Sequence, residues 1–265
     1  GGHNLILIGP PGSGKTMLAK RLPSILPPMT VVESLETTKI HSVTGKLNEN
    51  VGLITQRPFR NPHHTISDVA LVGGGSYPQP GEISMSHNGV LFLDELPEFK
   101  RSVLEVMRQP LEDREVTISR AKYTLTYPSS FMLVASMNPS PSGYFNNSDA
   151  PIISSPYEMQ RYLSKISGPL LDRIDMHIEV IPILYNELRA SKQEETSAII
   201  ANRVKNAREI QSHRFKNEEG TYTNAQMNSS QLKKYCPLTS DSEAILKKAM
   251  EKFKSKAENL EKEMN

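Results

Sequence analysis

The sequence has little of several residue types and patterns, and each shortage narrows the class of protein. Its only cysteine is Cys236, so no intramolecular disulfide framework holds the fold, and a reducing cytoplasm is the expected compartment. No apolar run reaches the length of a membrane span, and the first residues lack the basic-then-apolar pattern of a secretion signal. The formal net charge is only +2, so any nucleic-acid partner must be inferred from local features. We therefore expect a soluble cytoplasmic protein with no membrane partner.

The size and the order of apolar runs indicate an α/β protein. With 265 residues and 37% hydrophobic content, the chain can bury one α/β core and a smaller second domain. Strand-like apolar runs alternate with helical or irregular stretches, which predicts a parallel sheet covered on both faces. These runs are Leu5 to Ile8, Val90 to Leu93, Phe131 to Ala135 and Met176 to Ile181. Polar stretches with helical spacing follow, so we predict a nucleotide-binding domain over residues 1–182 and a helical domain over 183–265.

A glycine-rich stretch follows directly after the first apolar run and leads into a helical pattern. Its residues are Gly9, Pro10, Pro11, Gly12, Ser13, Gly14, Lys15 and Thr16. Gly12 and Gly14 let the backbone N–H groups turn inward around phosphates. Lys15 can then reach the β and γ oxygens, and the Thr16 hydroxyl can ligate Mg²⁺. The helix adds the positive end of its dipole, and its expected buried side carries Met17, Leu18 and Leu22. This order of elements predicts a site for ATP with Mg²⁺.

Two carboxylates end the apolar run from Val90 to Leu93. Asp94 and Glu95 follow it at once, and ligands bind at this edge of an α/β sheet. Asp94 would hold the Mg²⁺ through water, and Glu95 would orient and deprotonate the attacking water. Acidic residues also end strands merely by leaving the core, which is the structural alternative. Together with the glycine-rich loop, the pair predicts ATP hydrolysis.

Two further polar residues stand beside predicted strands. Asn138 follows the run from Phe131 to Ala135, and an amide there can hydrogen-bond the γ-phosphate or the attacking water. Arg173 comes just before the last run. Its guanidinium is either a structural ion-pair partner of Asp172 or Asp175, or a charge offered to the triphosphate of a neighbouring subunit. The sequence leaves both interpretations open.

Four long segments outside the glycine-rich loop carry a family resemblance. They cover residues 59–65, 80–84, 87–99 and 166–175. From Asn4 to about Val180 the chain resembles the AAA+ ATPases of the magnesium-chelatase-like group, which includes the YifB and ComM proteins. The resemblance implies the P-loop NTPase fold, a three-layer α/β sandwich with a parallel sheet, followed by a small helical lid that is incomplete here. Relatives also carry an upstream domain, so we expect a fragment of a longer protein.

The resemblance also implies how the active site is completed. It implies a ring, a hexamer, with active sites between subunits. Arg173 then becomes the arginine finger acting in trans, and Asn138 becomes the sensor of the γ-phosphate. An arginine of this kind can raise the rate about 10³ to 10⁵-fold. An isolated monomer should therefore hydrolyse ATP poorly.

The segment from Val116 to Tyr127 is the candidate DNA element. Its apolar residues occupy even positions and then odd ones, with Arg120 and Lys122 at the crossover. This pattern predicts a hairpin with a basic tip. Replicative helicases of the same clade carry a DNA-gripping hairpin at this place, and Lys122 resembles their tip lysine. Contacts to phosphates would be independent of base sequence and sensitive to salt. The alternative is a solvated tip whose charges serve solubility.

The chain departs from the family pattern in two places. Relatives often carry four cysteines, in a pattern like a zinc site, where this chain has Ser140, Ser142, Ile152 and Ser154. These side chains cannot replace thiolates around Zn²⁺, so no zinc is expected. The second departure is in the C-terminal part, where the Ala-Arg sensor of the family's lid is not found.

The adjacent His63 and His64 are expected on opposite faces of the chain, which makes them a poor metal pair.

Three functions are compatible with the predicted nucleotide site. The leading hypothesis is a Mg²⁺-dependent ATPase motor that acts on DNA, a branch-migration helicase in recombination as the ComM resemblance implies. The alternative is a motor that remodels a protein partner, as the magnesium-chelatase motor subunit does. A third possibility is a nucleotide-gated assembly module with little turnover. The intact pair of Asp94 and Glu95 argues against this third possibility.

Overall fold

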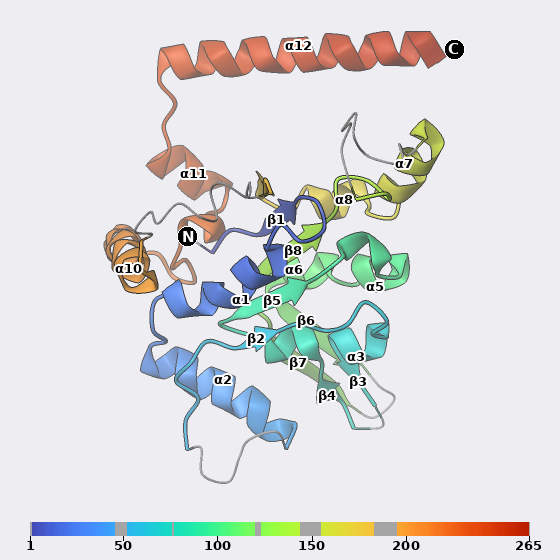
Figure 1. Ribbon diagram of the computed structural model, residues 1–265. Helices are drawn as coiled ribbons and strands as arrows, with labels where there is room; N and C mark the ends of the chain where they lie inside the picture. Colours follow the sequence, from blue (N-terminus) through green and yellow to red (C-terminus); the bar gives the residue numbers. More distant parts are fainter. Residues whose placement is uncertain are drawn as a thin grey trace.

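The structure is a computed structural model that describes residues 2–45, 52–75, 77–119, 123–143, 155–182 and 195–264, with side chains of the last helix described to residue 252. A central sheet lies among helices, and the C-terminal helices lie along the left side and across the top of the view (Figure 1). None of the helices in these ranges is long and apolar enough to cross a membrane.

The central sheet has five parallel strands in the order β2-β5-β8-β1-β9. Their bounds are β1 (Leu5–Ile8), β2 (Phe59–Arg60), β5 (Val90–Leu93), β8 (Met132–Met137) and β9 (Met176–Glu179). Four strands confirm the predicted runs to within two residues. The short β2 was not predicted. Strands covered on both faces are apolar, which is why an apolar run located β1, β5 and β8. Strand β9 is exposed at all four residues, and only its alternating Met176 and Ile178 are apolar.

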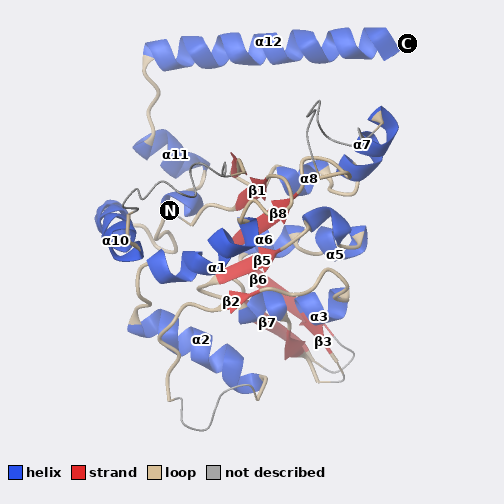
Figure 2. Cartoon of the chain, viewed as in Figure 1, coloured by secondary structure: helices blue, strands red, loops and turns tan. Residues whose placement is uncertain are grey.

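Alternate side chains of β1, β5 and β8 enter two different hydrophobic cores. Leu91 and Leu93 belong to the larger core, whereas Val90 and Phe92 belong to the smaller one, because successive side chains of a strand point to opposite faces. Complete burial of one such side chain contributes about 1.5–3 kcal/mol. A sheet with a core on each face is the middle of three layers (Figure 2). The predicted three-layer α/β sandwich is therefore confirmed.

Helices cover both faces of this sheet. Those before the C-terminal part are α1 (Lys15–Ile25), α2 (Val31–Val43), α3 (Asp68–Val72), α4 (Glu82–Met85), η1 (Leu96–Glu98), α5 (Arg101–Glu105), α6 (Arg108–Asp113), α7 (Pro156–Leu163) and α8 (Gly168–Leu171). Ala19 of α1 packs in the smaller core, while Leu170 of α8 packs in the larger one. Both α2 and α7 begin with a capping box, which satisfies free N–H groups of the first turn.

The buried side of α1 differs from the expected one. Met17 and Leu18 are 54% and 46% exposed, whereas Lys15 and Ala19 are buried. Only Leu22, which packs partly against the smaller core, lies as predicted. The helix begins at Lys15, directly after Gly14, so Lys15 turns inward toward the glycine-rich loop and the apolar residues that follow it lie on the outer side.

Two short antiparallel sheets lie beside the central one. They are formed by β3 (Gly73–Gly74) with β4 (Gln79–Pro80), and by β6 (Glu115–Ser119) with β7 (Thr124–Pro128). The second pair confirms the predicted hairpin, with Val116 opposite Tyr127. The two hairpins touch, because the Tyr127 hydroxyl donates to the carbonyl oxygen of Pro78 at 2.8 Å. Arg120 and Lys122 lie outside the described residues.

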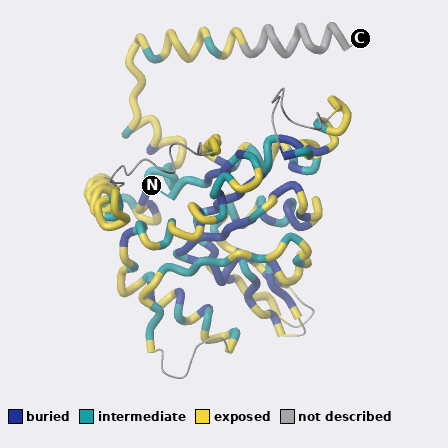
Figure 3. Tube along the Cα trace, in the orientation of Figure 1, coloured by how far each residue is buried: buried dark blue, intermediate teal, exposed yellow. Residues whose placement is uncertain are grey.

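The C-terminal part is helical, as predicted. It contains α10 (Ser197–Arg214), η2 (Asn224–Gln226), α11 (Ser229–Tyr235) and α12 (Ser240–Met264). Helix α10 packs against α1, and α12 extends along the end of the molecule farthest from α2 (Figure 1). Buried residues are concentrated in the sheet, while α10 and the described part of α12 are mostly exposed (Figure 3). The predicted boundary at residue 183 falls outside the described residues, so the domain division stays a prediction.

Candidate nucleotide-binding site

The glycine-rich loop, residues 9–16, joins β1 to α1 at the carboxyl edge of the sheet. Gly12 and Gly14 have φ angles of +77° and +87°, a region that glycine adopts at no steric cost. Gly9 has a different constraint, because an added Cβ would lie 2.3 Å from the carbonyl oxygen of Val180. A side chain would therefore be strained or blocked at each of these three positions. The glycines allow the loop to turn tightly at the start of α1.

Lys15 fills the centre of this curl. Its Nζ donates to the carbonyl oxygens of Gly9 and Pro10 at 2.7 and 2.8 Å, and to Oδ1 of Asn138 at 3.2 Å. Burial lowers the pKa of Lys15, and the negative charges of Asp94 and Glu95 oppose that shift. The loop thus holds one positive charge directed at the ends of β5 and β8.

Asp94 lies against the first turn of α1. The Thr16 hydroxyl donates to Oδ2 of Asp94 at 2.7 Å, and the hydroxyl of Ser136 donates to the other carboxylate oxygen. Ser136 is completely buried. Its Oγ also accepts a hydrogen bond from the backbone N–H of Glu95 at 3.2 Å. A carboxylate oxygen and a hydroxyl oxygen side by side form the kind of donor set that Mg²⁺ prefers.

Sequence reasoning assigned no role to Ser136. The signal was its position as the one hydroxyl in the otherwise apolar strand 132–137. Because Leu93 pairs with Ala135 in the parallel register, the next residues along both strands, Asp94 and Ser136, fall opposite each other. The chain positions alone did not reveal this pairing, which depends on knowing that β5 and β8 are neighbours.

Glu95 has a left-handed backbone conformation at the start of η1, with φ 55° and ψ 52°. Few residues other than glycine adopt this region, and here it turns the side chain outward. The Glu95 side chain is 61% exposed, and its Oε2 lies 3.8 Å from Nδ1 of His64. The two neighbouring acids therefore have different surroundings, since Asp94 is held by two hydroxyls and Glu95 is open to solvent.

Asn138 follows β8 directly and completes the set around Lys15. Its side-chain oxygen accepts from Lys15, and its backbone oxygen accepts from the hydroxyl of Tyr162 at 3.1 Å. Burial raises the pKa of Tyr162 to about 12, so the hydroxyl remains a donor at neutral pH. The structure thus brings together Lys15, Thr16, Asp94 and Asn138, and their roles in binding and hydrolysis stay predictions.

Arg173 lies after α8, and its ion pair differs from the two considered as the structural alternative. Its Nη2 pairs with Glu112 of α6, and its Nη1 donates to the carbonyl oxygen of Pro169 at 2.8 Å. Asp175 instead accepts from the backbone N–H of Asn4 at 2.7 Å. Of the two alternatives left open by the sequence, the ion pair with Asp172 or Asp175 is therefore not the one formed, and the arginine finger stays a prediction. Helices α6 and α8 both pack on the larger core, which brings Glu112 within reach of the guanidinium.

Several other predicted positions can be placed. The hydroxyl oxygens of Ser140 and Ser142 lie 2.9 Å apart, whereas Ile152 and Ser154 lie outside the described residues. The rings of His63 and His64 lie 4.1 Å apart, so the expectation that they point to opposite faces is wrong. They belong to a turn, where strand alternation does not hold. Within the described ranges, no group of three His, Cys, Asp or Glu side chains could hold a metal ion.

The fold and this loop define an α/β P-loop domain of the AAA+ type. The sequence matches the family model for magnesium chelatase, subunit ChlI, over residues 1–188, and the model for the C-terminal part of that subunit over residues 194–262. The chain belongs to this magnesium chelatase ChlI family.

Curated relatives agree with the family match. The chain is 47% identical over 255 residues to competence protein ComM of Haemophilus influenzae, a match that covers 96% of this chain and 48% of the relative. It is 45% identical over 246 residues to the uncharacterized protein YifB of Salmonella typhimurium, covering 91% of this chain and 46% of the relative. The chain thus spans about half the length of the curated relatives it matches.

Proposed function

We propose that this chain is the Mg²⁺-dependent ATPase domain of a ring-forming motor that acts on DNA. The proposal that the chain hydrolyses ATP rests on one observation: Lys15, Thr16, Asp94 and Asn138 lie together at one edge of the sheet. The loop also contains a buried hydroxyl, Ser13 Oγ, without a hydrogen-bond partner among the described residues. A buried polar atom without a partner is costly, and a bound phosphate oxygen would supply one.

The residues of the loop suit a triphosphate with its metal. Mg²⁺ would be held by the Thr16 hydroxyl and, through water, by Asp94, and it would neutralise charge on the phosphates. Few carboxylates are needed for this, because the phosphates supply the remaining oxygen ligands. The Lys15 ammonium, now satisfied by the loop carbonyls of Gly9 and Pro10 and by Asn138, can exchange these acceptors for phosphate oxygens.

Glu95 and Asn138 are proposed as the groups that act on the attacking water. The Glu95 carboxylate is exposed at the edge where the loop ends, so it can accept a proton from water placed in line with the γ-phosphate. The amide of Asn138, 3.2 Å from the Lys15 ammonium, can hydrogen-bond the same water or a γ-phosphate oxygen. Hydrolysis then depends on a proton acceptor, Glu95, and a hydrogen-bond donor, Asn138, which follow the neighbouring strands β5 and β8.

Arg173 is proposed as the arginine finger offered to a neighbouring subunit. Its guanidinium contacts Glu112 and Pro169. Its backbone oxygen accepts from the side chain of Asn4, before β1, whereas the nucleotide loop follows β1 at the opposite edge of the sheet. It is 29% exposed, so a second copy of the chain can reach it. We propose a homo-oligomeric ring, a hexamer, in which Arg173 of one subunit completes the site of the next.

DNA is proposed as the substrate of the motor. The hairpin of β6 and β7 supports this, because it has the predicted antiparallel register and its connecting segment carries Arg120 and Lys122. The likeness to a protein named for competence supports it as well, and branch migration during recombination is the specific activity that we propose. The direct test is ATP hydrolysis with and without DNA, since only a DNA motor should be stimulated.

A motor acting on a protein partner is the second candidate, and the match to the magnesium chelatase family models favours it. The two candidates separate by one measurement. If DNA leaves the hydrolysis rate unchanged while a co-purified protein raises it, the partner-driven function replaces the DNA motor. The assignment of the nucleotide site is common to both.

A further inference from the structure

His64 lies in the turn after β2, at the same sheet edge as the two acids. Because β2 pairs in parallel with β5, both strands end at this edge. The backbone N–H of Ile66 donates to the carbonyl oxygen of His63 at 2.9 Å, which closes the turn with His64 as its second residue. This hydrogen bond therefore fixes the backbone position of His64, from which its imidazole extends.

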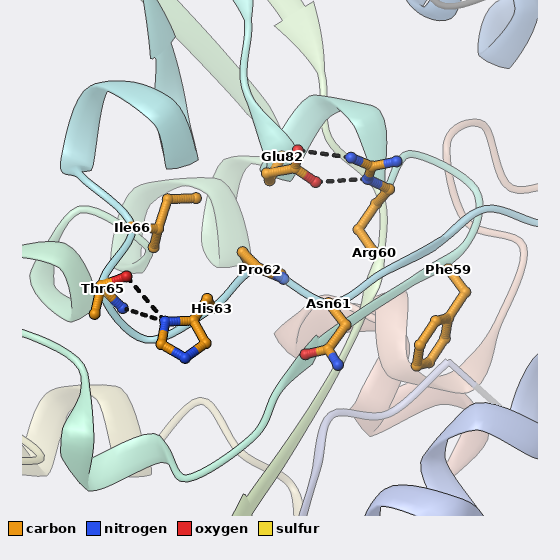
Figure 4. A pocket seen from close by; sticks show the side chains of 8 residues that line it. All are labelled: Phe59, Arg60, Asn61, Pro62, His63, Thr65, Ile66 and Glu82. Carbon is orange, nitrogen blue, oxygen red and sulfur yellow. Dashed lines mark hydrogen bonds and ion pairs between the residues drawn. The ribbon is translucent and has the colours of Figure 1, made fainter.

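An ion pair between Arg60 and Glu82 lies where β2 leads into this turn. The guanidinium of Arg60 donates to both carboxylate oxygens of Glu82, at 2.5 and 2.7 Å. This bidentate hydrogen bonding raises the pKa of Arg60. The two side chains meet at an open pocket of about 440 Å³ lined by the turn (Figure 4). On the other side of the pocket, His63 Nδ1 lies 2.9 Å from the Thr65 hydroxyl, so His63 is engaged within the turn.

The imidazole of His64 is also held by its neighbours. The His63 ring lies 4.1 Å away, and Phe99 meets it edge-on at 6.4 Å with an interplanar angle of 77°. Phe99 is only 3% exposed and so provides a fixed surface. In this orientation Nδ1 of His64 faces Oε2 of Glu95 at 3.8 Å, a separation that a single water or a small torsion can bridge.

We propose that His64 is a positioning residue for the Glu95 carboxylate. Within the described part of the chain, His64 is the only side chain in polar contact with that carboxylate. The Glu95 side chain is exposed and has several rotamers, so without a partner it would point toward the attacking water for only part of the time. A misplacement of about 1 Å can lower a rate by about 10²-fold. This inference rests on the proposed role of Glu95 as the base.

The test compares His64→Ala, His64→Gln and the matched control His63→Ala in the full chain. His63 is the adjacent imidazole but contacts Thr65 and not Glu95. We expect His64→Ala to lower kcat between about tenfold and a hundredfold, with the KM for ATP and the melting temperature unchanged. His64→Gln keeps a side-chain N–H donor and should recover most of the rate. His63→Ala removes only a ring neighbour of His64 and leaves the contact with Glu95, so it should lower kcat much less than His64→Ala.

Two outcomes would overturn the inference. One is a wild-type kcat in His64→Ala. The other is an equal loss in His63→Ala, which would indicate a general effect of the turn. The variant Glu95→Gln separates these from a failure of the proposed function. If Glu95→Gln is inactive while His64→Ala is fully active, only the role of His64 fails. If Glu95→Gln hydrolyses ATP normally, the assignment of Glu95 as the base fails.

Discussion

The hydroxyl of Ser136 joins the two acids of the site, because it donates to the carboxylate of Asp94 and accepts from the backbone N–H of Glu95. One buried side chain on β8 thereby sets the position of both residues at the end of β5. Its removal would leave a carboxylate oxygen and a backbone N–H without this partner. A buried polar group left unpaired in this way costs about 1–3 kcal/mol.

Ser136→Ala should therefore lower the free energy of unfolding by about 1–3 kcal/mol and raise the Mg²⁺ concentration needed for ATP hydrolysis. Denaturant unfolding and a Mg²⁺ titration of the hydrolysis rate measure the two effects. Ser129→Ala is the matched control, because Ser129 is equally buried but its Oγ has no hydrogen-bond partner in the described structure. A Ser136 variant with the same Mg²⁺ requirement as the control would show that Asp94 is held without the serine.

Glu95→Gln should bind ATP and fail to hydrolyse it. The glutamine keeps the shape of the side chain and leaves Asp94 in place, while the water loses its proton acceptor. A general base contributes about 10²–10⁴-fold, so kcat should fall by that factor while calorimetry still shows ATP binding. Glu98→Gln, in the same η1 helix and paired with Lys165 at 3.2 Å, should behave like the unsubstituted chain. Loss of ATP binding in Glu95→Gln would contradict the assignment.

Arg173→Ala should leave ATP binding normal and lower hydrolysis by about 10³ to 10⁵-fold. Mixing this variant with Lys15→Ala subunits should restore part of the activity, since each supplies what the other lacks across an interface. Glu112→Gln distinguishes the finger from a structural ion pair. It removes the charge that Arg173 pairs with but keeps the guanidinium, so hydrolysis should persist. Equal losses in Arg173→Ala and Glu112→Gln would indicate a structural role.

The double variant Arg120→Ala, Lys122→Ala should lose the stimulation of ATP hydrolysis by DNA while keeping basal hydrolysis. Contacts to phosphates weaken steeply as salt rises, so stimulation of the unsubstituted chain should also fade with increasing salt. Lys39→Ala, an exposed lysine on α2, serves as the control for a simple loss of positive charge. Stimulation that survives in the double variant would place the DNA contact elsewhere.

The C-terminal helices should lose stability in acid through Glu218. Hydrogen bonds from Lys234, Gln231 and Tyr235 lower the pKa of Glu218 to about 2. The unfolded value is about 4.3, so the stabilising effect is complete above that pH and is lost as the pH falls toward 2. We expect Glu218→Gln to be less stable than the unsubstituted chain at neutral pH, with the difference shrinking below about pH 4. A difference that is constant with pH would contradict this.

Much of the fold followed from the sequence because buried parallel strands are apolar throughout. The runs that became β1, β5 and β8 were visible for that reason, whereas β9 is exposed and was marked only by its alternating apolar residues. Strand β2 has only two residues, one of them the charged Arg60. The hairpin was visible from its alternation. The exposed side of α1 was missed, because an inward Lys15 rotates the helix in a way that apolar spacing does not reveal.

The site was predictable where one motif contained its parts, and less so where distant segments meet. The loop and the two acids are local patterns, so their residues were identified directly. Ser136, Glu112 and His64 have partners on other elements. Their contacts depend on which strands pair and which helices share a core, and residue spacing does not contain that information.

The close approach of Gly9 to Val180 has a mechanical consequence. A Cβ on Gly9 would collide with the carbonyl of Val180, and the N–H of Val180 donates to the carbonyl of Ile8 at 2.7 Å. Because no side chain separates them, the first bend of the loop and the end of β9 are in direct backbone contact. We therefore expect a shift of the loop to move the end of β9 with it, and through that strand the backbone that leads back toward Arg173.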